Sequence, residues 1–470
     1  MSVVDLEAEL GMVELGDRRR SVRAVAIGRE LADDPSRSFP SMFDSAGLEA
    51  WYRFSNSEAV SPGRLLAPHF SGAWARAGER QCLIVHDTTE VSFPGESERE
   101  GLHFTGTRNL LHLHVSLAVE LTEAPVVHGF VGANAYVLRG GLWGEVKESG
   151  ELEALGSGSE RWENAARQVN SAAPSSSSLV HVMDREADDY TLWVAIMGMG
   201  DDFVIRSARN RRTTEPAVYL FDRLVGAPIL LQREVILSRR SPQRPPSDRK
   251  YHPSRESRPA VLSARAGTVE ILRSKRLPAG SAPPSMTVNV VEVVEQNPPE
   301  GVDPVAWRLI TSLPVATPAD VATVIDIYRK RWLVEEFFKA LKTGCSLEER
   351  QAESRRALLN TIAVLAPAAI RLLQVRALGR NAATRDEPAQ LSEDERGALM
   401  AMPRAKLPRN PSNRDVMLAM ARLGGLLKPK HEPGWLVLGR GYAVFAQFLE
   451  GWMAAKSAPS LRRSRPRRQL

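Results

Sequence analysis

Cysteine is almost absent from this sequence of 470 residues. Only Cys82 and Cys345 occur, which argues against a disulfide framework or a structural zinc site and fits a reducing compartment. No apolar stretch is long enough to cross a membrane, because the run VLAPAAIRLLQV is interrupted at Arg371. The N-terminus, MSVVDLEAEL, is acidic and has no signal-peptide apolar run. We therefore expect a cytoplasmic protein.

A strong excess of one charge is also lacking. The chain has 62 Lys and Arg against 56 Asp and Glu, a net charge of +6, which permits a polyanionic partner without requiring one. With 43% hydrophobic and 25% charged residues the composition is that of a globular protein. The length allows several domains and at least one large core.

Hydrophobic patterning predicts strands in the middle of the chain and helices at both ends. Residues 1–70 read as helices, and a helical region follows the start signal at Pro318–Asp320. Apolar or alternating runs predict strands at 81–93, 111–121, 126–138, 179–183, 202–212, 260–272, 286–296 and 305–315. Further helices are predicted at 355–378, 413–427 and 442–456.

Two segments are strongly basic. Residues 238–259 hold seven Lys/Arg, two acids and five prolines, and the tail at 461–470 holds five Arg and no acid. We expect a mobile loop and a disordered tail from 457 onward. For both, solvated charge and non-specific DNA affinity are the two open interpretations.

The stretch YRKRWLVEEFFKALKTG (328–344) has the periodicity of a helix. At about 100° per residue, four polar side chains share a strip roughly 60° wide: Tyr328, Arg331, Glu335 and Lys342. Lys339 lies beside this strip, which we expect to face solvent. The other side is apolar, with Leu333, Val334, Phe337 and Leu341. A solvated face with helix-stabilising ion pairs is the ordinary explanation. A charged site is the alternative, if other carboxylates join Glu335.

Two aspartates interrupt apolar strands. Asp87 follows CLIVH and Asp184 follows VHVM, and a carboxylate at the carboxyl edge of a strand points into the crevice where α/β proteins bind ligands. Asp184 could instead cap the next helix, and Asp87 could start a turn. Together with Glu335 they would supply the oxygen ligands that a pair of magnesium ions needs for phosphodiester cleavage. The cations of the strip would then contact phosphates.

The spacing Y-x2-R-x3-E-x6-K, from Tyr328 to Lys342, resembles the motif of the DDE transposases of insertion sequence family four. Similar segments occur in the same order: HDTTEVSF around Asp87, MDREADDY around Asp184, FVIRS through Arg206 and WRLITSLPV from Trp307. The resemblance extends from LGDRRR (15–20) to LEGWMAAK (449–456).

The resemblance implies an α/β fold with a ribonuclease-H-like mixed sheet core. That catalytic core would span 71–365, interrupted by a β-rich insertion at 207–305. A helical DNA-binding domain at 1–70 would precede it, and a helical dimerisation domain at 366–456 would follow.

The resemblance also implies an activity. Asp87, Asp184 and Glu335 would be catalytic and would hold two magnesium ions, with manganese able to substitute. The residues implied to contact DNA are Tyr328, Arg331, Lys339, Lys342, Arg206 and Trp307, the last by holding a base outside the stack. The implied partners are double-stranded DNA, both transposon ends and target, and a second copy of the chain, with no membrane and no small-molecule substrate.

The implied reaction is cut-and-paste transposition. The enzyme would bind terminal inverted repeats, excise the element through a hairpin and join its 3′ ends to target DNA. A related DNA nuclease and a non-catalytic DNA-binding regulator remain alternatives. A two-carboxylate glycosidase would leave the cationic strip unexplained.

Overall fold

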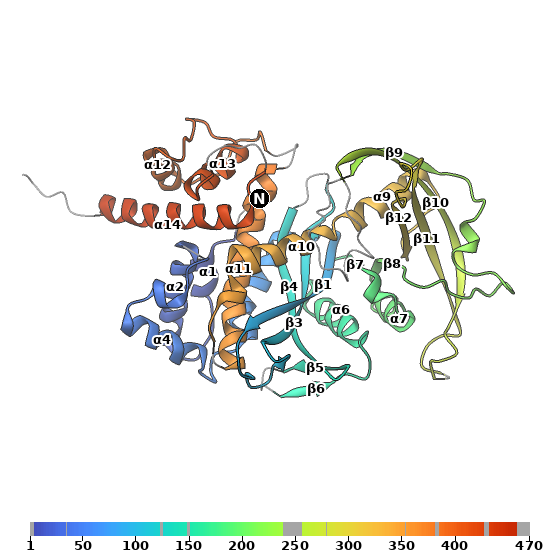
Figure 1. Cartoon of the computed structure of the whole chain (residues 1–470), viewed down its shortest axis with the longest axis horizontal. Coiled ribbons are helices and arrows are strands. Elements are labelled where there is room, and N and C mark those ends of the chain that lie inside the picture. Colours follow the sequence, from blue (N-terminus) through green and yellow to red (C-terminus); the bar gives the residue numbers. More distant parts are fainter. Residues whose placement is uncertain are drawn as a thin grey trace, which may run out of the picture.

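A single mixed β-sheet organises the chain (Figure 1). The computed structural model describes residues 4–33, 35–122, 126–147, 151–237, 256–278, 280–352, 354–380, 385–426 and 432–457. Most of the predicted basic loop, and the whole Arg-rich tail, lie outside these residues. The strands are β1 (Cys82–Pro94), β2 (His103–Phe104), β3 (Arg108–Glu120), β4 (Val126–Arg139), β5 (Leu142–Val146), β6 (Leu152–Ala154), β7 (Leu179–Met183), β8 (Asp202–Arg206), β9 (Leu231–Leu237), β10 (Arg258–Leu272), β11 (Ser285–Gln296) and β12 (Ala306–Thr311).

Helices occupy both ends of the chain and flank the sheet. The first group is α1 (Leu6–Gly11), α2 (Arg18–Asp33), α3 (Phe39–Met42), α4 (Ser45–Ser55) and α5 (Pro62–Ala77). Within the core are α6 (Glu160–Ala172), α7 (Tyr190–Gly198), α9 (Pro318–Arg329) and α10 (Trp332–Lys339). The last group is α11 (Arg355–Arg380), α12 (Glu393–Ala401), α13 (Asn413–Leu423) and α14 (Trp435–Ser457).

The strand order is β6-β5-β4-β3-β1-β7-β8-β12-β11-β10-β9, with β2 paired to β3. The contacts β1–β7 and β7–β8 are parallel, and the remaining neighbours are antiparallel. This mixed α/β architecture agrees with the predicted class and is compatible with a ribonuclease-H-like fold. The strands β9, β10 and β11 fall in the predicted β-rich segment 207–305, and they extend the same sheet through β12 and β8.

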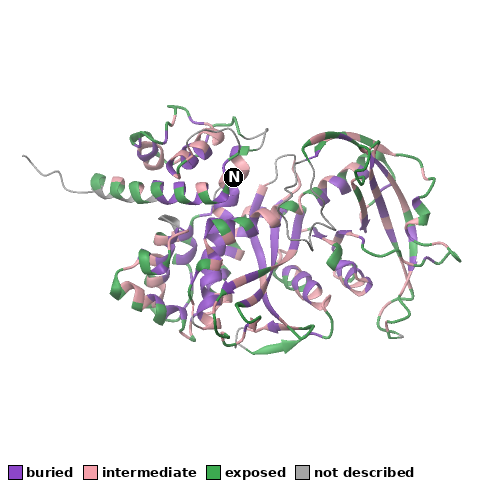
Figure 2. Cartoon of the chain, in the orientation of Figure 1, coloured by how far each residue is buried: buried purple, intermediate pink, exposed green. Residues whose placement is uncertain are grey.

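The sheet is buried on both faces at its centre (Figure 2). On one face, Val85 and Val182 belong to a large apolar cluster that includes Val334 and Phe337 of α10. On the other, Met183 and Phe203 pack with Trp162 of α6 and Trp193 of α7. Strands buried on both sides explain the continuous apolar runs in the sequence.

The long helix α11 passes through the interior. It is the one helix in the described ranges with the length and hydropathy to cross a membrane, and 83% of its apolar window is buried within the fold. Burial of that kind is characteristic of a core helix. Because α5 continues past residue 70 and α11 past residue 365, the domain boundaries predicted at 70/71 and 365/366 fall inside helices.

The helices α13 and α14 approach each other backbone to backbone. A Cβ atom on Gly441 of α14 would lie 1.6 Å from the carbonyl oxygen of Met420. A Cβ on Gly424, just after α13, would lie 1.9 Å from the carbonyl oxygen of Val437. Glycine at these positions is therefore what permits the crossing.

We predict that Gly441→Ala lowers the free energy of unfolding by about 2–3 kcal/mol, because the added methyl must push two backbones apart. Thermal denaturation followed by circular dichroism measures the effect. Gly451→Ala is the matched control, since it lies on the same helix with no atom within 4 Å of the new Cβ. There we expect no loss, and a gain of up to about 1 kcal/mol from helix propensity. Equal melting temperatures of the Gly441→Ala and Gly451→Ala variants would refute the close crossing of α13 and α14.

Candidate active site

The parallel pairing of β1 with β7 aligns the two predicted aspartates. The pairs run from Cys82↔Leu179 to Val85↔Val182, so the same register carried two residues further sets Asp87 beside Asp184. Neighbouring strands are about 4.8 Å apart, and side chains two residues along a strand return to the same face. Both carboxylates therefore lie on the face covered by α10, which contacts β1.

The two aspartates differ in where they sit on their strands. β7 ends at Met183, so Asp184 lies at its carboxyl end as predicted. β1 continues to Pro94, so Asp87 lies inside the strand and the prediction that it ends one is wrong. A carboxylate is tolerated at position 87 because β7 ends at Met183. Beyond that point β1 has no partner strand on the β7 side.

Backbone N–H groups orient both carboxylates. Thr88 N–H donates to Oδ1 of Asp87 at 2.8 Å, and Glu186 N–H donates to Oδ1 of Asp184 at 2.8 Å. The second bond also caps the 3-10 turn Arg185–Ala187, so the capping interpretation of Asp184 is correct alongside its alignment with Asp87.

Arg331 lies between the carboxylates of Asp87 and Glu335. One Nη is 3.1 Å from Oδ2 of Asp87, and the other Nη bonds Oε1 of Glu335 one turn later. The i,i+4 bond to Glu335 is the kind of ion pair that the ordinary explanation of this strip predicts, whereas the bond to Asp87, which is far away in the chain, was not predicted. The guanidinium thus places a positive charge between Asp87 and Glu335.

The electrostatics of Asp87 reflect this crowding. Burial raises the pKa of Asp87 to about 7, the Arg331 guanidinium opposes the rise, and the charges of Asp184 and Glu335 add to it. Burial lowers the pKa of Arg331, but Tyr328, Asp87 and Glu335 outweigh burial and hold that pKa above its usual value. Asp87 therefore interacts electrostatically with both of the other predicted acids.

The predicted acids suit a hard divalent cation. All three offer carboxylate oxygens, which magnesium and manganese prefer, and the Arg331 guanidinium demonstrates that a cation is accommodated between Asp87 and Glu335. Within the described parts of the chain, no three His, Cys, Asp or Glu side chains are close enough to hold one ion. The chemistry of the three side chains therefore suits a divalent cation, but their carboxylates are not gathered around one point in this structure, where Arg331 bridges Asp87 and Glu335.

The helical stretch from 328 to 344 is not one uniform helix. α9 ends at Arg329, α10 begins at Trp332, and Ala340–Gly344 forms a π-helical turn. Tyr328 is buried, with 6% of its surface exposed, and Arg331, Glu335 and Lys342 are half-buried. The prediction that this strip faces solvent is therefore wrong. The strip faces the sheet, since Arg331 bonds Asp87 and Lys342 bonds the Glu90 carbonyl, both on β1.

The two lysines of this stretch are engaged within the chain. Lys342 Nζ donates to the Glu90 carbonyl and lies 3.7 Å from Oε1 of Glu348. Lys339 pairs with Glu336 at 3.1 Å and lies 4.4 Å from the centre of the Trp332 ring. Lys342 thus reaches β1 close to Asp87, whereas Lys339 points along the helix surface.

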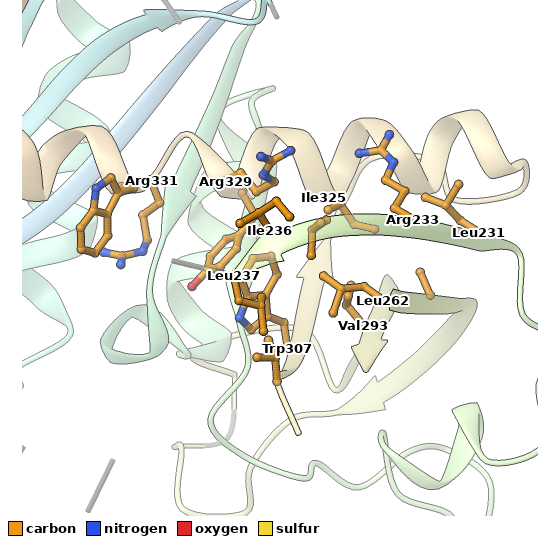
Figure 3. A pocket seen from close by; sticks show the side chains of 15 residues that line it. Leu231, Arg233, Ile236, Leu237, Leu262, Val293, Trp307, Ile325, Arg329 and Arg331 are labelled. Atoms are coloured by element: carbon orange, nitrogen blue, oxygen red, sulfur yellow. The ribbon is translucent and has the colours of Figure 1, made fainter. Parts of the chain in front are cut away.

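A cavity of about 420 Å³ is lined in part by Arg331 (Figure 3), whose guanidinium bonds Asp87 and Glu335. Its walls come from β9–β12 and α9, and they include Trp307, Tyr328 and Arg331. The rings of Trp307 and Tyr328 meet edge to face with centroids 5.6 Å apart. The cavity is otherwise mainly apolar, lined among others by Leu231, Leu237, Leu262, Val293 and Ile325.

Arg206 belongs to the same region. It pairs with Leu309 of β12, and its guanidinium donates to the carbonyl of Ala306 at 3.4 Å. Burial raises the pKa of Tyr328, while Arg331 and Arg206 lower it, so Arg206 lies close enough to Tyr328 to act on its charge. Trp307, Tyr328 and Arg331 thus line one cavity, and Arg206 lies near Tyr328 without lining the cavity itself.

Two stretches of the chain match known protein families. Residues 6–60 match the transposase DNA-binding family, and residues 165–370 match the transposase DDE domain family. The second match contains Asp184, Glu335 and the cavity residue Trp307, and the first covers most of the predicted N-terminal DNA-binding domain. The DDE domain indicates a metal-dependent enzyme that cleaves DNA and transfers strands.

The pKa of Asp87 gives a pH-dependent prediction for the metal-free protein. The folded pKa of about 7 exceeds the ordinary value of 3.8, so ionised Asp87 destabilises the fold above pH 7, and this penalty disappears as the pH falls to about 4. Asp87→Asn removes the penalty. In EDTA, we expect Asp87→Asn to raise the free energy of unfolding by about 1–2 kcal/mol at pH 8, with little change near pH 4.5. Denaturant melts at both pH values measure it, and an equal loss of stability at both would contradict the assignment.

Proposed function

We propose that this transposase works by cut-and-paste in the manner of insertion sequence family four. It binds the terminal inverted repeats of its element, excises the element through a hairpin intermediate and joins the 3′ ends to target DNA. The observation that supports this most is the parallel β1–β7 register, which sets Asp87 beside Asp184 beneath the helix that carries Glu335.

In this proposal Asp87, Asp184 and Glu335 are the catalytic residues and the ligands of two magnesium ions, with manganese able to substitute. Such a pair of ions activates the attacking oxygen and stabilises the leaving oxygen of a phosphodiester. The buried, low-polarity surroundings that raise the pKa of Asp87 strengthen the attraction of these carboxylates for cations. Arg331 then leaves Asp87 and Glu335, and its planar guanidinium takes a DNA phosphate through two parallel hydrogen bonds.

The cavity beside Trp307 receives a base swung out of the duplex. Formation of a hairpin bends the strand sharply, and a base held outside the stack relieves that bend. Trp307 offers an indole face on a wall of the cavity, and Tyr328 supports it edge-on. The remaining apolar walls accept a base without sequence-specific hydrogen bonds.

Cationic side chains around the crevice hold the transposon end. We assign phosphate contacts to Arg206, Arg331, Lys339 and Lys342, and a backbone contact to Tyr328. Lys342 and Lys339 exchange their present acceptors, the Glu90 carbonyl and Glu336, for phosphate oxygens. The N-terminal helices add binding affinity, since Arg18 and Arg19 at the start of α2 are exposed.

Two copies of the chain act together on DNA, in our proposal, through the C-terminal helices. α14 leaves large apolar side chains exposed at 38–49%, namely Leu436, Val444, Phe448 and Met453. A helix with such side chains buries them against a partner when one is present. The complex acts in the bacterial cytoplasm, where its DNA substrate lies.

Glu335→Gln tests the catalytic assignment. The amide keeps the size of the side chain but weakens cation binding, so we expect gel shift with the DNA that flanks the gene to persist while nicking in Mg²⁺ falls at least about 10³-fold. Glu90→Gln is the control, because Glu90 is an exposed carboxylate on the same strand as Asp87. Nicking by Glu335→Gln at the wild-type rate would remove Glu335 from the reaction.

Trp307→Ala tests the base-holding role. Loss of a stacking surface worth about 1–3 kcal/mol should leave the first nick unchanged and reduce hairpin yield by about 5-fold to 100-fold. Denaturing gels that resolve nicked, hairpin and fully cut ends measure both steps. Trp307→Phe should recover part of the yield, and an unchanged hairpin yield in Trp307→Ala would exclude the role.

A further inference from the structure

Arg161 is a buried cation to which the reaction described so far gives no task. It is the second residue of α6, and only 6% of its side chain is exposed. Its guanidinium lies 4.3 Å from the Trp143 ring centre and 5.6 Å from that of Trp162. Arginine is rarely buried to this extent unless its donors are used, and here every branch of the guanidinium has an acceptor.

The acceptors of Arg161 come from the two segments that carry the aspartates. Nε donates to Oγ1 of Thr88 at 3.3 Å, and one Nη donates to Oε2 of Glu186. The other Nη donates to the carbonyl of Gly158, just before α6. Thr88 directly follows Asp87, and Glu186 lies two residues after Asp184.

Thr88 and Glu186 are also the residues whose N–H groups hold the aspartate carboxylates. Each donates its backbone N–H at 2.8 Å to Oδ1 of its aspartate. One guanidinium therefore binds the side chains of both residues that orient the carboxylates. Thr88 is fixed further by His114, whose Nδ1 is 2.9 Å from Oγ1.

We propose that Arg161 is a positioning residue that sets the spacing of Asp87 and Asp184, and through it the affinity of the site for a divalent cation. The proposal rests on the function assigned above, in which these two aspartates bind metal. Between two neighbouring strands the backbone ladder fixes the Cα positions, but β7 ends at Met183 and leaves the segment carrying Asp184 outside the ladder. Arg161 supplies the missing connection, from Glu186 on that segment to Thr88 on β1.

The chemistry of the group suits this task. A planar guanidinium bonds several acceptors in fixed directions, whereas a lysine ammonium cannot hold the same fork. The two flat indoles restrict its movement. Burial lowers the pKa of Arg161, and the carboxylates of Glu186 and Asp184 oppose that change, so the positive charge of the group also acts on Asp184.

The test is Mn²⁺ binding by the full-length protein, measured from the electron paramagnetic resonance of free Mn²⁺ in the absence of DNA. We expect Arg161→Gln to weaken Mn²⁺ binding about 10-fold to 100-fold, the range typical of groups that support metal ligands. Arg161→Lys should weaken it similarly. Arg167→Gln, on an exposed position of the same helix where Arg167 pairs with Glu163, should bind Mn²⁺ as the wild type does.

Because the Arg161 variants could misfold, two further variants each remove one of the side-chain bonds of Arg161, to Thr88 or to Glu186. Thr88→Val and Glu186→Gln should each weaken Mn²⁺ binding by a smaller factor, and adding Arg161→Gln to the pair should weaken it no further. The proposal would be overturned if Thr88→Val and Glu186→Gln both bound Mn²⁺ with an affinity within 3-fold of the wild type. The same affinity in a folded Arg161→Gln would also overturn it. The proposed metal ligands are tested separately with Asp87→Asn and Asp184→Asn. If these two variants bind Mn²⁺ as the wild type does, the assignment of the aspartates as metal ligands is wrong.

Discussion

The in-register parallel pairing of β1 with β7 is the constraint on which the site depends. Backbone hydrogen bonds between these strands fix the relative height of Asp87 and Asp184, which are far apart in the chain. The buried valines below them, Val85 and Val182, lock the register, because a slip by one residue would turn both aspartates to the opposite face. α10, which carries Glu335, packs on β1, and Arg331 links Glu335 to Asp87.

Nearby positive charges offset the cost of placing Asp87, Asp184 and Glu335 within the fold. A buried carboxylate is unfavourable unless it is paired, and Asp87 shows this in its raised pKa. Arg331 supplies a counter-charge to Asp87 and Glu335, and Arg161 supplies one beside Asp184. The site is thus built around cations from the outset, which suits a reaction in which acids, metal ions and phosphates meet.

Much of this arrangement could be predicted from the sequence, since the apolar runs located nearly every strand of the sheet centre and the motif spacing located Arg331 and Glu335. The errors have physical causes. Tyr328 was expected in solvent because a helical projection records which residues share a side but not what packs there. Asp87 was expected at a strand end because the sequence does not show that a neighbouring strand stops. The segment with α6, and with it Arg161, carries no motif, and its partners are known only once β1 and β7 are side by side.

The most direct measurement is anomalous diffraction from crystals of the protein bound to its end DNA and Mn²⁺. We expect manganese peaks coordinated by carboxylate oxygens of Asp87, Asp184 and Glu335, and the Arg331 guanidinium turned from the acids to a phosphate. Manganese bound elsewhere, with Arg331 still joining Asp87 to Glu335 in the DNA complex, would contradict it.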